Sequence, residues 1–258
     1  MNVRYAFLDP TGNRTLLVET ATPVPEQPAL AARLMALEPS AEQVGFLTVR
    51  EDGTYLRMAG GEFCGNAVMC AAALLALDGA LSPGGTVRIR VSGAAEPVPV
   101  TVVPLPDGSL RGRVSMPRPI SVGVEPFPDG IPHPVVRFEG IAHVILEDPL
   151  SRAEAESLAP VWCRRLAADA LGLMLLDREA GTLTPLVYVP AAGTLCWENS
   201  CASGTTAVGA FLAAERGAAS CVLRQPGGTL QAEVTPAGEL FLTGSVRLLR
   251  RTQVSLDE

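Results

Sequence analysis

Two cysteines in this sequence stand directly before short, Ala-rich apolar segments. Cys64 lies in "EFCGN", just ahead of residues 67–77, and Cys201 lies in "NSCASG", just ahead of residues 207–212. A thiol at the start of a helix meets backbone N–H groups without partners and the positive end of the helix dipole. Both effects favour the thiolate and lower a cysteine pKa from its free value of about 8.5. Cys64 and Cys201 are therefore candidate acid–base residues.

The same helix starts are candidate binding sites for a carboxylate, because backbone N–H groups at a helix N-terminus bind anions. The residues after each cysteine are small enough for a ligand to approach the backbone: Gly65 and Asn66 in one case, Ala202, Ser203 and Gly204 in the other. With one thiol on each side of an α-carbon, a thiolate could remove the α-proton while the opposite thiol delivers a proton to the other face. This chemistry is racemisation or epimerisation, and it needs no cofactor.

The other four cysteines have a simpler interpretation. None has a helix-start setting with small neighbours, and an isolated cysteine is usually a small buried hydrophobe. We expect this of Cys70, Cys163, Cys196 and Cys221.

Four further residues are candidates for structural or substrate-binding roles. His143 in "AHVILE" is expected to be a structural histidine with its hydrogen bonds satisfied, and Trp197 a core residue or a pocket wall. Glu42 and Glu198 flank the candidate site, and each is either a solvated carboxylate or a substrate contact.

Composition excludes several classes of protein. All 20 basic residues of the 258 are arginine, so there is no lysine for a pyridoxal phosphate Schiff base or a P-loop. No dinucleotide-binding Gly-x-Gly-x-x-Gly is present, and the two histidines with no Cys-x-x-Cys pair argue against a structural zinc site. We therefore expect no cofactor and no metal.

Charge and hydropathy bound the partners and the compartment. The net charge is −7 with no basic run, which argues against nucleic acid and against an anionic membrane surface. The longest apolar run, residues 67–77, is shorter than the roughly 20 residues that span a bilayer, and the N-terminus lacks a signal-peptide core. We expect a cytoplasmic protein that acts on a small molecule, with a homodimer as one possible assembly.

The chain repeats one order of elements. Residues 31–76 and 163–214 each contain a helical segment, two strands around Asp-Gly or Ala-Gly, a cysteine and an Ala-rich helix, and further strands follow each. Helices that are apolar on nearly every side must be buried. The prediction is an α+β protein with two pseudo-symmetric domains, each a curved, mostly antiparallel sheet wrapped around a central helix. The predicted domains are 1–117 plus 247–258 and 118–246, linked by the Pro-rich stretch 117–134.

The paired motifs resemble those of a known family. "DPTGNRTLLV", "EQVGF", "GGEFCGNAVM", "PLVYVP", "WENSCASGT" and "QPGG" follow each other as in the cofactor-independent amino-acid racemases of the diaminopimelate epimerase and proline racemase superfamily. The resemblance extends over most of the chain. The strings "EQVGF" and "WENSC" are most similar to the branch of histidine racemases that serves staphylopine-type metallophore biosynthesis.

The resemblance implies a diaminopimelate epimerase-like fold with the active site between the two domains. It also implies that Cys64 and Cys201 are the two bases. Positions matching the family's contacts to the substrate's amino group, or the residues that fix the site, are Asn13, Gln43 and Asn66. Positions matching its carboxylate-binding amides are Gly65, Asn66, Ala202 and Ser203.

Two departures from the superfamily bear on the substrate. Diaminopimelate epimerases carry a Glu-Arg pair upstream of the second cysteine, whereas this chain reads "VYVPAAGTLC". Their Asn-Pro-His turn is replaced by residues 141–143, Ile-Ala-His. Both changes disfavour a substrate with a second amino-acid head and favour a neutral or weakly basic side chain, with histidine preferred. Alternatives are a proline-type epimerase or dehydratase, an epimerase of the diaminopimelate type, and a non-catalytic protein that binds an amino acid or a metal.

Overall fold

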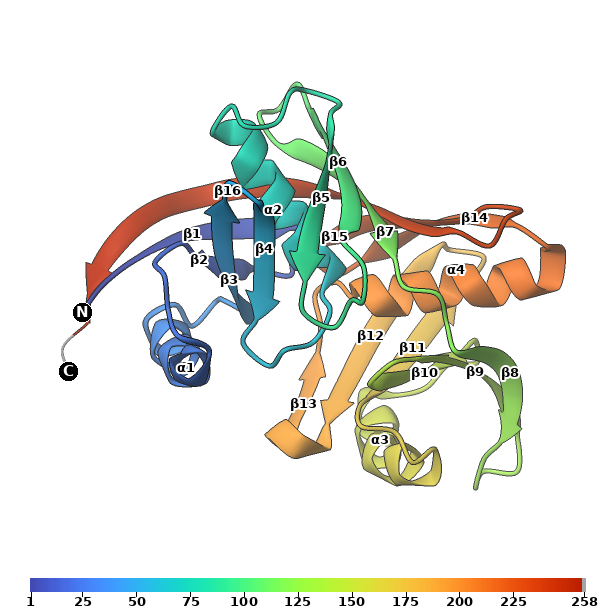
Figure 1. Ribbon diagram of the computed structural model, residues 1–258. Helices are drawn as coiled ribbons and strands as arrows, with labels where there is room; N and C mark the ends of the chain where they lie inside the picture. The colour runs from blue at the N-terminus through green and yellow to red at the C-terminus, as the bar shows by residue number, and fades with distance from the viewer. Residues whose placement is uncertain (257–258) are drawn as a thin grey trace. The chain divides into compact units, whose positions relative to one another are not determined.

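The computed structural model describes residues 1–256 of the chain, which divides into two compact units (Figure 1). Unit 1 comprises residues 1–115 and the chain from Thr243 onward, and unit 2 comprises residues 116–242. Strands outnumber helices in both, so the chain is α+β and mostly strand, as the sequence predicted. No helix among residues 1–256 combines the length and apolar character needed to cross a membrane.

Unit 1 contains the helices α1 and α2 and the strands β1 to β7. In chain order its elements are β1 (Asn2–Pro10), β2 (Thr15–Val18), η1 (Val24–Glu26), α1 (Gln27–Leu37), β3 (Gln43–Arg50), β4 (Gly53–Met58), α2 (Gly65–Leu77), β5 (Thr86–Val91), β6 (Val98–Pro104) and β7 (Leu110–Met116). Strand β16 (Leu240–Ser255) begins in unit 2 and pairs with β1 from Pro10↔Val246 to Asn2↔Ser255.

Unit 2 has the same kinds of elements. They are β8 (Ser121–Pro126), β9 (Pro132–Phe138), β10 (Ile141–Leu146), α3 (Arg152–Arg165), β11 (Leu171–Asp177), β12 (Thr182–Val189), η2 (Pro190–Ala192), β13 (Thr194–Trp197), α4 (Ala202–Arg216), β14 (Ala219–Gln225) and β15 (Gly228–Val234). The stretch 117–134, expected to be a linker, instead supplies β8 and the start of β9, which pair antiparallel. Proline is tolerated at these positions, because Pro126 ends β8, a strand at the end of the described sheet order, and Pro132 and Pro134 precede Val135–Phe138, the part of β9 that pairs with β10.

Strand direction follows from the connections. Most of the described pairs are antiparallel, whereas β2–β3, β4–β5, β10–β11 and β12–β14 are parallel. Each parallel pair is joined through an α-helix, respectively α1, α2, α3 and α4. Parallel neighbours need such a crossover because the chain must return to the same end of the sheet. The two cysteines therefore precede the helices of the second crossover in each unit.

Helix α2 is enclosed by the strands of its own unit. Every residue from Gly65 to Leu75 is buried, and the helix contacts β1, β2, β5 and β6. At Gly112 on β7, an added Cβ would lie 2.8 Å from Met69 Cγ, so this strand can pass over the helix only without a side chain. A helix apolar on all sides is stable in this setting because no face meets water.

Helix α4 has the corresponding place in unit 2, where it contacts β8, β9, β10, β11, β14 and β15. An added Cβ at Gly209 would lie 2.8 Å from the Ala232 side chain on β15, so the approach of this strand again depends on glycine. The helix ends at Gly217, whose φ of 83° is in the left-handed region that glycine adopts at helix C-termini.

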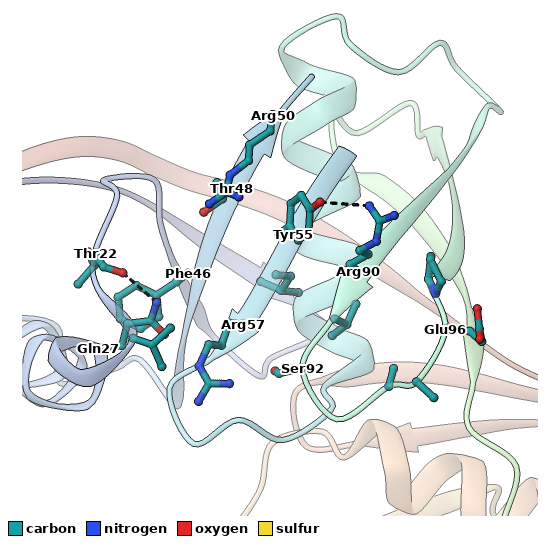
Figure 2. Close-up of a pocket in the computed structure, with 16 residues that line it drawn as sticks. Thr22, Gln27, Phe46, Thr48, Arg50, Tyr55, Arg57, Arg90, Ser92 and Glu96 are labelled. Atoms are coloured by element: carbon teal, nitrogen blue, oxygen red, sulfur yellow. Dashed lines mark hydrogen bonds between the residues drawn. The ribbon is translucent and has the colours of Figure 1, made fainter. Parts of the chain in front are cut away.

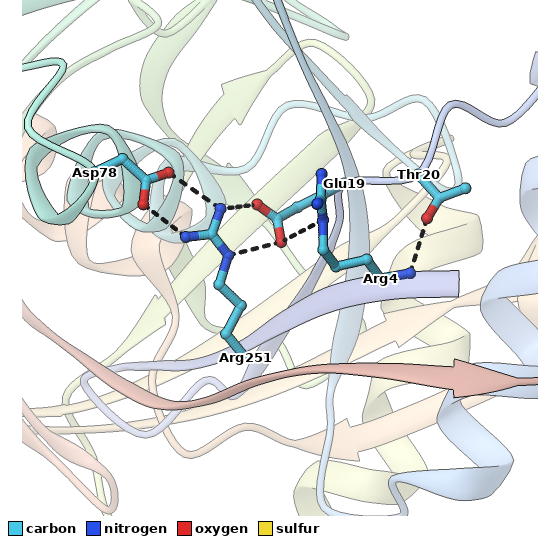
Figure 3. A network of polar contacts seen from close by, with 5 residues as sticks. All are labelled: Arg4, Glu19, Thr20, Asp78 and Arg251. Atoms are coloured by element: carbon cyan, nitrogen blue, oxygen red, sulfur yellow. Dashed lines mark hydrogen bonds and ion pairs between the residues drawn. The ribbon is translucent and has the colours of Figure 1, made fainter. Parts of the chain in front are cut away.

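A polar cluster fastens the return strand of unit 1 (Figure 3). The Arg251 guanidinium lies between two carboxylates: its Nη1 donates to Asp78 Oδ1 at 2.6 Å, and its Nε donates to Glu19 Oε2 at 2.9 Å. Asp78 is the C-cap of α2, and Glu19 follows β2. One side chain of β16 thus holds the end of the buried helix and the end of a neighbouring strand.

Candidate active site

Cys64 is the N-cap residue of α2. Its backbone is extended, with φ −138° and ψ 109°, and the N–H of Ala67 donates to its sulfur at 3.5 Å. Gly65 and Asn66 form the first turn and are buried. The sulfur therefore occupies the position in which a serine or aspartate oxygen usually caps a helix.

A chain of amide and carboxylate groups leads to this thiol. The Cys64 thiol donates to Gln43 Oε1 at 3.1 Å. The Gln43 amide Nε2 donates to Asn13 Oδ1 at 2.6 Å and to Thr15 Oγ1 at 2.8 Å, and Asn13 Nδ2 donates to Glu42 Oε2 at 2.7 Å. Because both donors of Gln43 Nε2 are used, its oxygen faces the sulfur. Four residues from β2, β3 and the loops before them thus orient one thiol.

Asn66 has an unused hydrogen-bond acceptor beside Cys64. The residue is 2% exposed, and its side-chain Oδ1 is buried with no partner among residues 1–256. A buried amide oxygen without a donor is unfavourable. This oxygen is therefore available to a substrate N–H.

Cys201 is the N-cap residue of α4. The N–H of Gly204 donates to its sulfur at 3.4 Å, and Ser203 Oγ lies 3.6 Å from the sulfur. Its backbone is held by Gln225, whose Oε1 accepts from the Cys201 N–H at 2.9 Å and whose Nε2 donates to Thr205 Oγ1 at 2.7 Å. Both helix starts that carry candidate thiols are therefore capped by sulfur.

The acidity of the two thiols differs from the sequence-based expectation. Burial raises the pKa of Cys64 to about 11, and the Ala67 N–H acts in the opposite direction without overcoming it. Burial also raises the pKa of Cys201 well above its ordinary value, and the negative charge of Glu198 adds to the effect. Cys201 is only 5% exposed. The helix end therefore stabilises each thiolate less than desolvation destabilises it.

Around Cys64 the structure gathers all the sequence-predicted residues of unit 1: Asn13, Glu42, Gln43, Gly65 and Asn66. Around Cys201 it places Glu198, Ala202 and Ser203. Both glutamates are half-buried: Glu42 accepts a hydrogen bond from Asn13, and Glu198 lies beside the Cys201 thiol.

Three residues of the two networks were not predicted: Thr15, Thr205 and Gln225. Gln225 stands in the "QPGG" string, which was a signal for it. Thr15 and Thr205 are common polar residues whose roles depend on strand and helix register. The structure also corrects the expectation that Cys196 is a buried hydrophobe. Cys196 is exposed on the short strand β13, which among the described residues pairs only with β12.

His143 is buried, but its hydrogen bonds are not satisfied. It is 0% exposed, and neither ring nitrogen has a partner among residues 1–256. Burial lowers its pKa to about 3, so the ring is neutral. Trp197 is half-buried against the core around α3, and its Nε1 donates to Glu156 Oε1 at 2.7 Å. Among residues 1–256, no three His, Cys, Asp or Glu side chains are grouped as metal ligands.

The fold is that of racemases and epimerases. Similar solved structures include a predicted epimerase from Pseudomonas aeruginosa (TM-score 0.76, 20% identity, 99% of this chain and 100% of that one). Another is a hydroxyproline epimerase from Agrobacterium vitis with bound trans-4-hydroxy-L-proline (TM-score 0.71, 14% identity, 100% of this chain and 93% of that one).

Sequence comparison narrows the class to one family. The family model described as the histidine racemase CntK N-terminal domain matches residues 2–248. The curated histidine racemase of Fusobacterium nucleatum strain ATCC 23726 is 31% identical over 97% of this chain and 96% of its own length. That of Staphylococcus aureus strain Mu50 is 30% identical over 88% and 87%. The chain therefore belongs to the histidine racemase family and is an isomerase, which confirms the resemblance found in the sequence.

Proposed function

We propose that the protein interconverts L- and D-histidine without a cofactor, with Cys64 and Cys201 as the two bases. The observation that carries the proposal is that each thiol caps a buried crossover helix and accepts a hydrogen bond from its first-turn backbone, by Ala67 N–H in one unit and Gly204 N–H in the other. The family's curated relatives, which are named histidine racemases, support the choice of substrate.

The proposed reaction has balanced proton transfers. A thiolate on one side of the α-carbon takes the α-proton and becomes a thiol. The opposite thiol gives its proton to the other face of the same carbon and becomes a thiolate. The product has inverted configuration, and the enzyme has exchanged the protonation states of its two sulfurs, so the reverse reaction can use the same groups.

The raised thiol pKa values suit this reaction. The α-proton of an amino acid is very weakly acidic, and a thiolate whose conjugate thiol has a pKa of about 11 is a stronger base than an ordinary cysteine thiolate. The cost is that the thiolate is rare at neutral pH. The substrate's ammonium group offsets part of this cost, because a positive charge beside the sulfur favours its ionised form.

The remaining residues bind and orient the substrate. The backbone N–H groups of Gly65, Asn66, Ala202 and Ser203 are suited to the carboxylate, because they lie in the first turns of α2 and α4. The unpartnered Asn66 Oδ1 is suited to the amino group. Asn13 and Gln43 act through the thiol that they orient.

The pseudo-symmetry of the two units belongs to the same proposal. It rests on the shared order of one α-helix crossover, an antiparallel hairpin and a second crossover whose helix is capped by cysteine. A duplicated unit would supply two equivalent thiols, which is what a reaction that runs on both faces of one carbon requires.

The test is racemisation in D2O followed by proton NMR at the α-carbon. Starting from L-histidine, the D-product should contain deuterium from the first turnovers while the remaining L-histidine keeps its proton, because different sulfurs act on the two faces. Cys64→Ala and Cys201→Ala should each lose racemisation, while Cys196→Ala, which removes an exposed thiol of unit 2, should retain it.

Two results would count against parts of the proposal. Deuterium entering L-histidine faster than D-histidine forms would contradict two bases. Faster exchange with another amino acid in a parallel screen would contradict histidine as the substrate but leave the two thiols in place.

A further inference from the structure

Unit 1 contains a pocket that takes no part in the cysteine network (Figure 2). Its volume is about 440 Å³, which is in the range of small-molecule sites. The floor is formed by β3, β4 and β5, and the walls by the segment around Thr22–Gln27 and by residues 94–97. None of Asn13, Glu42, Gln43 or Cys64 lines it.

Arg57 stands in the floor of this pocket. Strand register places it opposite Phe46 of β3, and Figure 2 shows Ser92 of the chain after β5 on its other side. Its Nε is buried and has no hydrogen-bond partner, and no carboxylate of residues 1–256 forms an ion pair with its guanidinium. A guanidinium without a partner presents several N–H donors in one plane, which suits the oxygens of an anion.

Gln27 contributes a second group without a partner, of the opposite kind. The residue is 6% exposed, and its Nε2 donates to Thr22 O at 3.1 Å. Its Oε1 is buried with no donor among residues 1–256. A buried amide oxygen calls for a hydrogen-bond donor. Two residues that line the pocket, Arg57 and Gln27, therefore each have a buried polar atom without a partner among residues 1–256.

Two more arginines raise the positive charge of the pocket. Arg50 and Arg90 each lie 5.3 Å from the centre of the Tyr55 ring, and Arg90 Nη1 donates to the Tyr55 hydroxyl at 3.2 Å. Glu96 is the single carboxylate among the lining residues. With three guanidinium groups and one carboxylate, the lining has a net charge of +2, although the chain as a whole carries −7. Asp52, outside the lining, accepts a hydrogen bond from the Tyr55 hydroxyl. Its charge offsets part of the charge of Arg50 and Arg90, so Arg57 is the main anion-binding group.

We propose that this pocket binds a small phosphate ester. A phosphate monoester carries a charge of about −1.5 to −2 at neutral pH, which matches the lining, and its oxygens suit the planar donors of Arg57. A hydroxyl on the organic part of the ligand supplies the donor that Gln27 Oε1 lacks. The site is separate from the proposed racemase chemistry, so it stands or falls independently of that function.

The test is calorimetric titration of the full-length protein with inorganic phosphate, glycerol 3-phosphate and ribose 5-phosphate, with acetate at matched ionic strength. We expect saturable binding of the phosphates, weakened by added salt, and tighter binding of the two esters than of inorganic phosphate if the hydroxyl reaches Gln27. If inorganic phosphate bound more tightly than both esters, the ligand of the Arg57 guanidinium would be free phosphate and not an ester.

Three variants assign the binding to this pocket. Arg57→Gln should weaken it about 10- to 100-fold, the usual effect of losing a hydrogen bond to a charged group. Arg88→Gln is the matched control, since this exposed arginine lies two residues before Arg90 on β5 and does not line the pocket. Thr48→Glu keeps every arginine but places a carboxylate in the pocket. Because this carboxylate repels an anionic ligand, the variant should also bind phosphate more weakly than the wild type. Equal binding by wild type, Arg57→Gln and Thr48→Glu, or acetate binding as tight as phosphate, would overturn the proposal.

Discussion

Two opposing effects determine the pKa of the Cys64 thiol. A helix N-terminus lowers a thiol pKa, and burial raises it. In the structure burial prevails and the pKa is about 11. The perturbation we choose is pH itself, because the thiolate is the form that alkylating reagents attack and its population changes tenfold per pH unit below the pKa.

The expected magnitude follows from this pKa. At pH 8 about one Cys64 in a thousand is ionised, compared with about a quarter of a free cysteine whose pKa is about 8.5. Population alone would slow alkylation about 250-fold. The more basic thiolate is intrinsically more reactive, and a Brønsted coefficient of about 0.4–0.5 over this pKa difference raises its rate about 10- to 18-fold. Cys64 should therefore react about 14- to 25-fold more slowly than a free thiol at pH 8, before any steric effect.

The assay is alkylation with iodoacetamide over a series of pH values, quantified for each cysteine by peptide mass spectrometry. The rate for Cys64 should rise about tenfold per unit from pH 8 to pH 10, with no plateau in that range. The shape of the profile is independent of access to the half-buried sulfur, which scales all rates alike. The exposed Cys196 serves as the internal reference for reagent reactivity. A plateau reached by pH 8 would show that the helix end outweighs burial and would refute the reasoning.

Two predictions concern stability. The unfolded chain protonates His143 near pH 6.5 whereas the buried ring resists protonation down to about pH 3, so His143 stabilises the fold above pH 6.5 and this contribution is lost as pH falls toward 3. In urea titrations His143→Leu should lose up to about 1.4 kcal/mol of dependence per pH unit in this window relative to wild type. Identical slopes in wild type and His143→Leu would contradict the assignment. Arg251→Met should lower the free energy of unfolding by about 1–3 kcal/mol, because it removes the charged hydrogen bonds to the Glu19 carboxylate, 9% exposed, and leaves it with the longer ion pair to Arg4 at 3.6 Å. The exposed Arg111 of β7 gives the control Arg111→Met, and equal denaturation midpoints for the two variants would show that the cluster in Figure 3 contributes little.

Features of the site that depend on consecutive residues can be predicted from the sequence, whereas those that depend on packing cannot. The setting of Cys64 and Cys201 before apolar helices is a property of a few consecutive residues, and both become N-caps. Their pKa values depend instead on desolvation by strands that are distant in sequence, so the expected direction was wrong. The helix dipole is visible in a sequence, whereas burial of a sulfur is not.

The same distinction applies to the elements. The hairpins around Asp52-Gly53 and Ala180-Gly181 follow from turn chemistry that is local. The Pro-rich stretch 117–134 looks like a linker because proline is rare inside sheets, yet Pro126 ends the edge strand β8, and Pro132 and Pro134 lie in β9 before its pairing with β10 begins. Gln225, which holds Cys201 in place, lies 24 residues away from it, and only the fold brings the two together.

Because β16 pairs with β1 of unit 1, unit 1 cannot finish folding during translation until the last strand has been synthesised. The residues of unit 2 are contiguous, so a ribosome releases all of them before it reaches the strand that pairs with β1. Until then β1 has β2 on one side and an open edge on the other, and Arg251 is not yet present to join Glu19 to Asp78. Open strand edges are sites of mispairing between chains. The unit that carries Cys64 is thus translated first and finished last, and a nascent chain that stalls before residue 243 exposes the first strand of the protein to any neighbour able to pair with it.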